Sequence, residues 1–240
     1  MAFIDLKIFS NALGMQTNVY VIIPERRETD AALKTLYLLH GLSDDNTIWM
    51  RRTSIERYAE KYGICVVMPF AEKSFYTDMK YGMDYYTYVA KELPEIMHTL
   101  FGLSRERECN FVAGLSMGGY GALKIALREK GRFAAAAGLS AACDMAARDK
   151  KGYFPAVFGD GDVPPEDDLF ALAESGKDAA DKPKIYLGVG TEDFLYGENQ
   201  KFKSYLTSLG YDLTYRESPG THNWEFWDEY IKYVLEWMFG

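Results

Sequence analysis

The sequence has few cysteines, no long apolar run and no basic leader. Three cysteines among 240 residues exclude a disulfide framework, and no two of them form the C-x-x-C pair typical of a structural zinc site. Cys65 and Cys109 lie in apolar runs, so we expect both to be buried. No apolar run approaches the roughly 20 residues of a membrane helix, so no membrane segment is predicted. Because the N-terminus also lacks signal-peptide features, we expect a cytoplasmic protein. The cysteine spacing leads us to expect no bound metal.

Basic residues are outnumbered by acidic ones, 27 against 35, which gives a formal net charge of −8. A protein that binds nucleic acid needs clustered lysine and arginine to neutralise phosphates, so the sequence excludes a general nucleic-acid partner. Apolar residues make up 48% and charged residues 26%, as is usual for a globular protein. We predict one α/β domain over residues 1–240, which is long enough to bury a large core.

Short apolar runs alternate with helical patterns along the chain. Residues 86–101 and 224–238 each place apolar side chains on one helical face, and Pro94 is expected to kink the first helix. The strand-like runs are residues 6–9, 19–23, 34–40, 64–68, 109–115, 133–139, 184–189 and 213–216. This alternation predicts a mainly parallel sheet with helices on both faces, opened by an antiparallel pair joined through residues 11–14. Ligands of such sheets bind at the carboxyl ends of the strands.

Residues 141–181 depart from this alternation. They carry several aspartates and the Pro164-Pro165 pair, and they show no strand pattern. We expect a cap-like excursion from the sheet. The Asp160-Gly-Asp162 triplet does not continue as a calcium loop, because the glycine and glutamate of that motif are replaced by Pro165 and Ala171.

The strongest chemical signal is Gly114-Leu-Ser-Met-Gly118, a G-x-S-x-G motif. It follows an apolar strand-like run and opens a helical pattern over residues 119–130, the context in which this motif presents a nucleophilic serine on a sharp turn. The glycines leave room for the turn to fold back, and Ser116 would stand near the positive end of the helix. We predict that Ser116 is a nucleophile.

A serine nucleophile needs a base, and the chain has three histidines. His98 lies within the predicted helix over residues 86–101, away from any strand end. His40 ends a buried strand, where we expect it to hold the adjacent loop. His222 lies in a Gly/Pro loop before the last helix and follows every candidate acid, in the chain order Ser, Asp, His. We predict that His222 is the base.

The acid should follow a late strand, and residues 184–189 are that strand. Glu192 and Asp193 both stand at its exit. We favour Asp193, because the second acid of a strand-end turn commonly points inward. Its carboxylate would hold the imidazole in one tautomer and stabilise the imidazolium.

An oxyanion site needs two backbone N–H donors. One is expected from Met117, the residue after the nucleophile. The other is expected from Leu42, in the loop after the strand that ends at His40, because Gly41 lets that backbone approach the site. Gly41, Tyr81 and Trp224 are candidate substrate-binding residues.

At these residues the sequence resembles the "putative esterase" branch of the α/β-hydrolases. That branch includes tributyrin esterases, esterase D (S-formylglutathione hydrolase), feruloyl esterases and the antigen 85 mycolyltransferases, and the resemblance is greatest to the bacterial tributyrin esterases. The matching segments are residues 36–41, 66–69, 76–78, 81–86, 92–94, 113–121 and 222–227. The resemblance implies an α/β-hydrolase fold with a mainly parallel eight-stranded sheet. It also places Ser116, Asp193 and His222 on the family's triad, and Leu42 and Met117 on its oxyanion donors.

One departure from this family concerns the substrate. The esterase D group carries a cysteine after the oxyanion-loop Gly-Leu, where Ser43 and Asp44 stand here. We therefore expect a serine carboxylesterase that acts on short-chain acyl esters, needs no cofactor and binds a small-molecule ester. An acetyl or feruloyl esterase on carbohydrates and a thioesterase remain alternatives, and an inactive binding module is a remote one. Whether the chain forms a homo-oligomer is left open.

Overall fold

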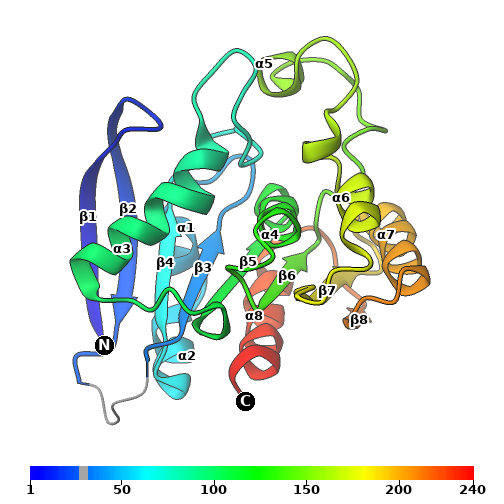
Figure 1. Cartoon of the computed structure of the whole chain (residues 1–240). Coiled ribbons are helices and arrows are strands. Elements are labelled where there is room, and N and C mark those ends of the chain that lie inside the picture. Colours follow the sequence, from blue (N-terminus) through cyan, green and yellow to red (C-terminus); the bar gives the residue numbers. More distant parts are fainter. Residues whose placement is uncertain (27–31) are drawn as a thin grey trace.

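The structure, a computed structural model, describes residues 1–26 and 32–240, and these form an eight-stranded sheet (Figure 1). The strand order is β1-β2-β4-β3-β5-β6-β7-β8. β1 and β2 are antiparallel to each other, β2 is antiparallel to β4, and all later pairs are parallel. The strands are β1 (Ala2–Ser10), β2 (Met15–Ile23), β3 (Thr35–Leu39), β4 (Cys65–Pro69), β5 (Asn110–Leu115), β6 (Ala135–Leu139), β7 (Lys184–Gly190) and β8 (Leu213–Ser218). The predicted mainly parallel sheet is confirmed.

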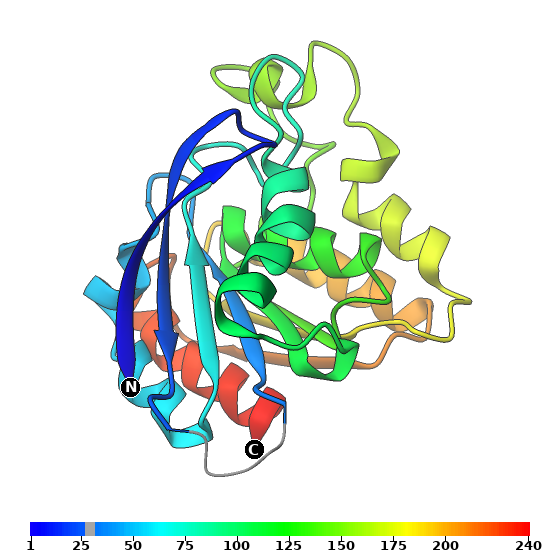
Figure 2. The ribbon, with the colours of Figure 1, turned by 60° about the vertical axis from the view of Figure 1, so that its left-hand side comes forward.

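Helices cover both faces of the sheet, as expected (Figure 2). One apolar layer lies under α1, α2 and α8, and the other lies under α3, α4, α6 and α7. The helices are α1 (Ile48–Arg52), α2 (Ile55–Tyr62), α3 (Leu93–Phe101), α4 (Met117–Arg128), α5 (Phe154–Phe158), α6 (Leu169–Gly176), α7 (Tyr196–Ser208) and α8 (Trp224–Phe239). Among the described residues, no helix combines the length and apolarity that crossing a bilayer requires.

The helix predicted over residues 86–101 consists of two parts. A π-helical stretch, Thr87–Glu92, leads directly into α3. The Leu93 N–H donates to the carbonyl of Tyr88, five residues back, and Pro94 follows in the first turn of α3. Because proline has no N–H for the α-helical ladder, the change of helix type just before it accommodates the break that the sequence predicted.

Several predicted boundaries need correction. Strands β1 and β2 begin at Ala2 and Met15, each four residues earlier than the predicted runs 6–9 and 19–23. Strand β5 begins at Asn110, because Arg107–Cys109 form a short 3-10 turn before it. Cys109 is therefore half-buried, whereas Cys65 in β4 is buried as expected. Helix α4 starts at Met117, two residues earlier than the pattern indicated, so that the helix begins directly after Ser116.

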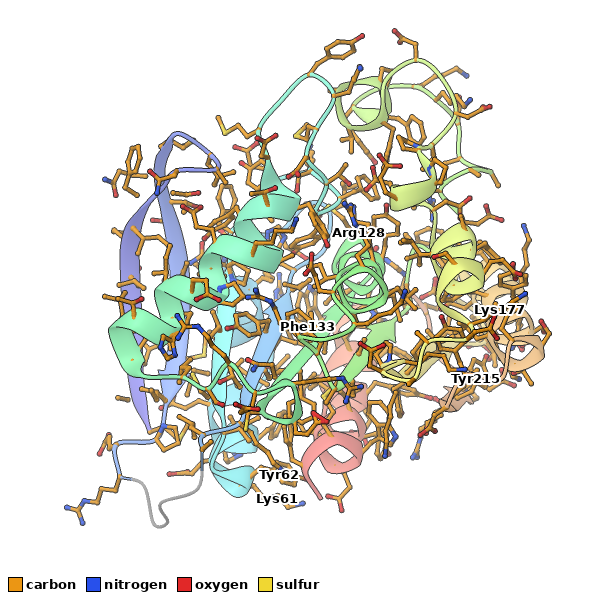
Figure 3. The ribbon with its side chains drawn as sticks, in the orientation of Figure 1. Lys61, Tyr62, Arg128, Phe133, Lys177 and Tyr215 are labelled. Atoms are coloured by element: carbon orange, nitrogen blue, oxygen red, sulfur yellow. The ribbon has the colours of Figure 1, made fainter. Side chains whose placement is uncertain are left out.

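The central strands carry side chains that are buried on both faces of the sheet. All residues of β3, β4, β5 and β6 are buried, which explains their near-continuous apolar runs. At the amino end of these strands, Lys61 and Tyr62 of α2 hold the last turn of α8 through Glu236 (Figure 3). The loops after β3, β5, β7 and β8 all leave the sheet at the opposite, carboxyl edge.

Residues 141–181 follow β6 and leave the sheet, and they contain α5, at the top of Figure 1, and α6, lower and to the right beside α7. Asp167, in the acidic stretch of this excursion, contacts two side chains of α4. The Lys124 ammonium, fully buried, lies 3.0 Å from Asp167 Oδ1, and the Tyr120 hydroxyl donates to the Asp167 carbonyl at 2.6 Å. On the next turn, Arg128 lies 3.7 Å above the Tyr86 ring (Figure 3). Helix α4 thus supports both the excursion and the helix preceding α3.

Candidate active site

Ser116 lies on a strained turn between β5 and α4. Its φ and ψ angles are 53° and −116°, a conformation that a residue with a side chain rarely adopts. The Ser116 N–H donates to the Leu139 carbonyl at 2.8 Å, and its carbonyl accepts from the N–H of Ala142 at 3.2 Å. These bonds to the neighbouring β6 end hold the strained backbone, and strain of this kind concentrates at functional sites.

The two glycines of the motif are required by close backbone contacts. A Cβ atom on Gly118 would lie 2.6 Å from the His40 carbonyl oxygen, and one on Gly114 would lie 3.0 Å from the Gly118 Cα. Distances this short are not tolerated by backbone atoms. The G-x-S-x-G spacing therefore follows from how tightly the turn packs against the end of β3.

His222 reaches Ser116 from the loop between β8 and α8. Its Nε2 atom lies 3.0 Å from Ser116 Oγ. The ring is packed edge-on by Trp227 at 4.8 Å between centroids, and the exposed ring of Phe194 lies 4.5 Å away on another side. Asn223 caps α8 by accepting from the Phe226 N–H at 3.1 Å, which fixes the start of that helix next to the imidazole.

The structure places the Asp193 carboxylate against the other side of the imidazole. His222 Nδ1 lies 2.9 Å from Asp193 Oδ2 and 3.1 Å from Oδ1, and the Leu195 N–H donates to Oδ1 at 2.8 Å. Burial of this carboxylate acts to raise its pKa, but the hydrogen bonds from His222, Leu195 and Ser140 outweigh burial and hold the pKa below its usual value. Asp193 is therefore ionised at neutral pH.

Glu192, the alternative acid, points elsewhere. Its carboxylate accepts from the Gly220 N–H and from the Thr191 hydroxyl, so it braces the loop that carries His222 without touching the ring. The hydrogen bond from Gly220 lowers its pKa. The two adjacent acids at the end of β7 therefore have different contacts. Their spacing in the sequence could not show which of them lies against His222.

Ser140 was missed by the sequence analysis. It is fully buried at the end of β6 with a positive φ of 46°, and its side chain hydrogen-bonds the Asp193 carboxylate. Its Oγ also accepts from Trp227 Nε1 at 3.1 Å. Ser140 thus supports Asp193 directly and, through Trp227, the wall behind His222. A lone serine after a strand gives no signal of this contact, because its partners lie 53 and 87 residues away.

The loop after β3 brings Leu42 to the same edge of the sheet. Leu42 and Met117 both border the pocket at Ser116, and within the described part of the chain neither backbone N–H has a hydrogen-bond acceptor. Gly41 is packed so closely that a Cβ there would lie 2.7 Å from Leu115 Cδ1. The close approach expected at Gly41 is thus required by packing.

His40 holds this loop from inside, as expected from its position. Its Nε2 accepts from the Ala71 N–H at 3.0 Å, and its Nδ1 donates to the Gly41 carbonyl at 2.7 Å. The Tyr76 hydroxyl donates to the His40 carbonyl at 3.0 Å. Burial lowers the pKa of His40 to about 4, so its ring is neutral near pH 7 and remains a structural group. His98 lies on α3, where its Nδ1 contacts the Leu103 carbonyl.

A pocket of about 480 Å³ opens beside Ser116. Most of its wall is apolar or aromatic, with three charged residues from the excursion at one side. It is lined by Leu42, Phe75, Ser116, Met117, Ala142, Arg148, Asp149, Lys151, Gly152, Tyr153, Phe154, Phe194 and Leu195. Its size is that of a small-molecule site.

The three candidate substrate-binding residues, Gly41, Tyr81 and Trp224, are not among the residues that line this pocket. Tyr81 is 65% exposed on a loop whose backbone is bonded to α5, and Trp224 packs edge-on against Trp49 and Trp227. The aromatic wall is supplied instead by Phe75 and Tyr153, whose rings stack at 5.9 Å. The sequence alone did not show which of its aromatic residues line the pocket.

The described residues contain no group of three or more histidine, cysteine or acidic side chains that could hold a metal ion. The chemistry available at the carboxyl edge of the sheet is therefore that of a hydroxyl, an imidazole and a carboxylate in line, next to two unpaired backbone donors. This arrangement can deprotonate the hydroxyl for attack on a carbonyl carbon and stabilise the oxyanion that results.

Comparison with known proteins agrees with this geometry. The family model described as "Putative esterase" matches residues 10–237. An acetyl esterase of Caldicellulosiruptor saccharolyticus is 33% identical, with 99% of this chain and 98% of that protein covered.

Two solved Staphylococcus aureus structures are similar over the whole chain. FphF, a fluorophosphonate-binding serine hydrolase in a substrate-bound structure, is 38% identical with a TM-score of 0.93, covering 100% of this chain and 98% of that one. FrmB, an S-formylglutathione hydrolase, is 39% identical with a TM-score of 0.89, covering 100% and 99%. The chain belongs to the putative esterase family of α/β-hydrolases and is a carboxylic ester hydrolase of the serine type.

Proposed function

We propose that this protein hydrolyses short-chain acyl esters, with Ser116 as nucleophile, His222 as general base and acid, and Asp193 as the group that orients His222. The observation that carries the proposal is the 3.0 Å distance between Ser116 Oγ and His222 Nε2 at the wall of the 480 Å³ pocket. The buried Asp193 carboxylate on the far side of the ring fixes the tautomer that leaves Nε2 free to accept.

In the proposed reaction, Ser116 Oγ attacks the ester carbonyl carbon as its proton moves to His222 Nε2. The developing oxyanion accepts hydrogen bonds from the N–H groups of Leu42 and Met117. The tetrahedral intermediate collapses as the imidazolium protonates the leaving alcohol. Water then attacks the acyl-enzyme with His222 again as base, and the acid is released while Ser116 regains its proton.

The shape of the pocket wall is evidence for a substrate with a short acyl chain. Phe75 stacks on Tyr153 and also contacts the rings of Tyr120 and Phe158, so one wall is packed by neighbouring aromatic side chains. Phe194 is 74% exposed and forms a rim beside His222. A small acyl group can lie against Phe75 while the alcohol leaves toward solvent. The similarity to an acetyl esterase supports the same size class.

Hydrolysis of p-nitrophenyl esters from acetate to decanoate tests this proposal, with Ser116→Ala beside the wild type. We expect turnover to be greatest for the shortest chains. In Ser116→Ala it should fall by as much as about 10⁶, because all later steps pass through the acyl-serine. Undiminished hydrolysis by Ser116→Ala would contradict the proposal, and a maximum at decanoate would contradict its substrate class.

The similarity to FrmB supports a second candidate, a thioesterase that acts on S-formylglutathione. Formyl is the smallest acyl group, and the same Ser116–His222 pair could release a thiol. Against this candidate, Ser43 stands exposed where the esterase D group carries a cysteine. Comparing kcat/KM for S-formylglutathione with that for p-nitrophenyl acetate distinguishes the two, and a much larger value for the thioester would favour the second candidate.

A further inference from the structure

β1 is the strand at one edge of the sheet, on the side away from the pocket beside β5, and β8 is the strand at the other edge. In the described part of the chain, β2 is the one strand that pairs with β1, over all nine residues of both. The other edge of β1 is therefore a row of backbone donors and acceptors at the side of the molecule (Figures 1 and 2). Such an edge can add another strand by main-chain hydrogen bonds.

The side chains of β1 alternate between the two faces of the sheet. Ile4, Leu6 and Ile8 pack against the apolar layer under α3. The opposite face carries two large aromatic side chains near the ends of the strand, with Phe3 45% and Phe9 54% exposed. Between them lie one acidic and one basic residue, Asp5 and Lys7, both exposed. Along this face of the strand the order of side chains is therefore aromatic, acidic, basic and aromatic.

This order is complementary to itself when the strand is reversed. If β1 pairs antiparallel with a second β1 about a two-fold axis at Leu6, each Asp5 lies opposite a Lys7, and each Phe3 lies opposite a Phe9. Opposite charges and aromatic pairs directly across a ladder are stabilising, and like charges are destabilising. On the inner face, each Ile4 would lie opposite an Ile8.

The neighbouring registers are unfavourable for the same reason. An axis at Asp5 would place two aspartates opposite each other, and an axis at Lys7 would place two lysines opposite each other. Directly opposite residues of an antiparallel pair have their side chains on the same face of the sheet, so the two-fold axis must pass through a residue and not between two residues. The axes nearest to Leu6 are therefore those at Asp5 and Lys7. The charges therefore favour the register whose two-fold axis passes through Leu6.

We propose that two copies of this chain associate through β1, antiparallel and centred on Leu6, so that their sheets join into one. The two-fold axis stands perpendicular to the sheet, which keeps α3 of both copies on the same side. Ser116, His222 and the pocket lie across the sheet at the ends of β5 and β8, so both pockets stay open.

Charge reversal tests the partner and the register together, with sedimentation over a dilution series as the readout. Asp5→Lys alone and Lys7→Asp alone each place two like-charged pairs across the axis, and each should raise the dimer dissociation constant about tenfold. The double variant Asp5→Lys/Lys7→Asp restores opposite charges and should return the constant to near the wild-type value.

Each other outcome overturns the proposal. A wild type that stays monomeric throughout the series excludes the dimer. A dimer that tolerates both single reversals lies on another surface, and failure of the double variant to recover excludes this register. Activity on p-nitrophenyl acetate, measured on every variant, reports that the fold is intact, since β1 takes no part in the site.

Disulfide trapping gives an independent measure of the register. Directly opposite residues of an antiparallel pair have Cα atoms about 4.5–5.5 Å apart, a span that a disulfide bridges. Leu6 is the one β1 residue that would face its own copy, so oxidised Leu6→Cys should give a covalent dimer. Asp5→Cys and Lys7→Cys are matched controls and should not, and cross-linking at either of them in place of Leu6 would refute the register.

Discussion

Two regions meet at Ser116, and they are held together in different ways. The carboxyl ends of β3, β5 and β7 are held by backbone hydrogen bonds and by glycines that leave no space for a side chain. The wall formed by residues 148–154 contacts α7 through the ion pair between Arg148 and Glu198. We therefore expect the first region to hold the reacting atoms closely, and the second to accept changes in composition more readily.

The contacts of the wall illustrate the second kind of construction. Glu198 on α7 accepts from Arg148 Nη2 at 2.7 Å and from the Asp144 N–H at 2.8 Å, and Lys201 pairs with Asp144 at 2.5 Å. Tyr153, farther along, is 41% exposed. Ion pairs near the surface contribute little each, so this wall is the region in which we expect substrate choice to vary.

After Ser116→Ala, the largest effect expected within the first region comes from Asp193→Asn. The amide would leave the His222 tautomer unfixed and remove the charge that stabilises the imidazolium. We expect kcat on p-nitrophenyl acetate to fall by about 10⁴, with the melting temperature little changed.

Glu192→Gln is the matched control for that change. It alters the adjacent acid, which hydrogen-bonds Gly220 and does not touch the ring, so we expect near wild-type activity. Similar losses in both variants would mean that Asp193 has no special role.

The next effect concerns the backbone contacts under the turn. In Gly118→Ala the new methyl would lie 2.6 Å from the His40 carbonyl oxygen and force the turn to move. Displacing reacting groups by about 1 Å can lower kcat by about 10², and overpacking of this kind destabilises a fold by about 1–3 kcal/mol. Steady-state rates and urea unfolding measure the two effects.

Gly161→Ala makes the same substitution in the excursion. A Cβ there meets nothing within 4 Å, so we expect changes in unfolding free energy below about 0.5 kcal/mol and unchanged kinetics. If Gly161→Ala were as damaging as Gly118→Ala, the contrast between the two regions would be wrong.

A smaller effect is expected from Ser140→Ala, which removes a hydrogen bond from the ionised Asp193 carboxylate. Hydrogen bonds to charged groups contribute about 1.5–3 kcal/mol, part of which a water can replace. We expect kcat to fall about tenfold while KM is unchanged, because Ser140 acts on His222 through Asp193. A rise in KM alone would show that Ser140 contributes to the pocket instead.

The smallest effect concerns the wall itself. Tyr153→Ala removes the ring stacked on Phe75 and lengthens the pocket. We expect the preference between acetate and octanoate esters to shift several-fold toward the longer chain, with kcat on acetate nearly unchanged. Loss of activity on every ester would indicate that the wall also supports the reacting groups.

These two regions also differ in how far the sequence predicts them. The glycines around Ser116, the histidine before the last helix and the apolar runs of the strands follow from local patterns, because each depends on residues close together in the sequence. The wall does not: Tyr81 and Trp224 were predicted to contact substrate, while the pocket is lined by Phe75 and Tyr153. Phe75 and Tyr153 stack although they are 78 residues apart in the sequence. The residues next to an aromatic side chain in a loop do not indicate such a distant partner.

The choice between Glu192 and Asp193 shows the same limit on a smaller scale. Both acids follow β7, and the direction of each side chain depends on the tight turn in which the Asp193 N–H donates to the Gly190 carbonyl. Gly220, in the loop after β8, contacts that turn by accepting from the Glu192 N–H at 3.0 Å, a contact that the sequence does not reveal. Sequence reasoning favoured Asp193 over Glu192, and in the structure the Asp193 carboxylate contacts His222 while that of Glu192 contacts Gly220.

The central claim is that Ser116 is a nucleophile activated by His222, and covalent labelling tests it most directly. The protein would be treated with a fluorophosphonate probe, digested, and analysed by mass spectrometry for the modified residue. The account predicts a single adduct on Ser116, no labelling of Ser116→Ala, and much slower labelling of His222→Ala. Labelling of another residue, or equal labelling of Ser116 with and without His222, would contradict it.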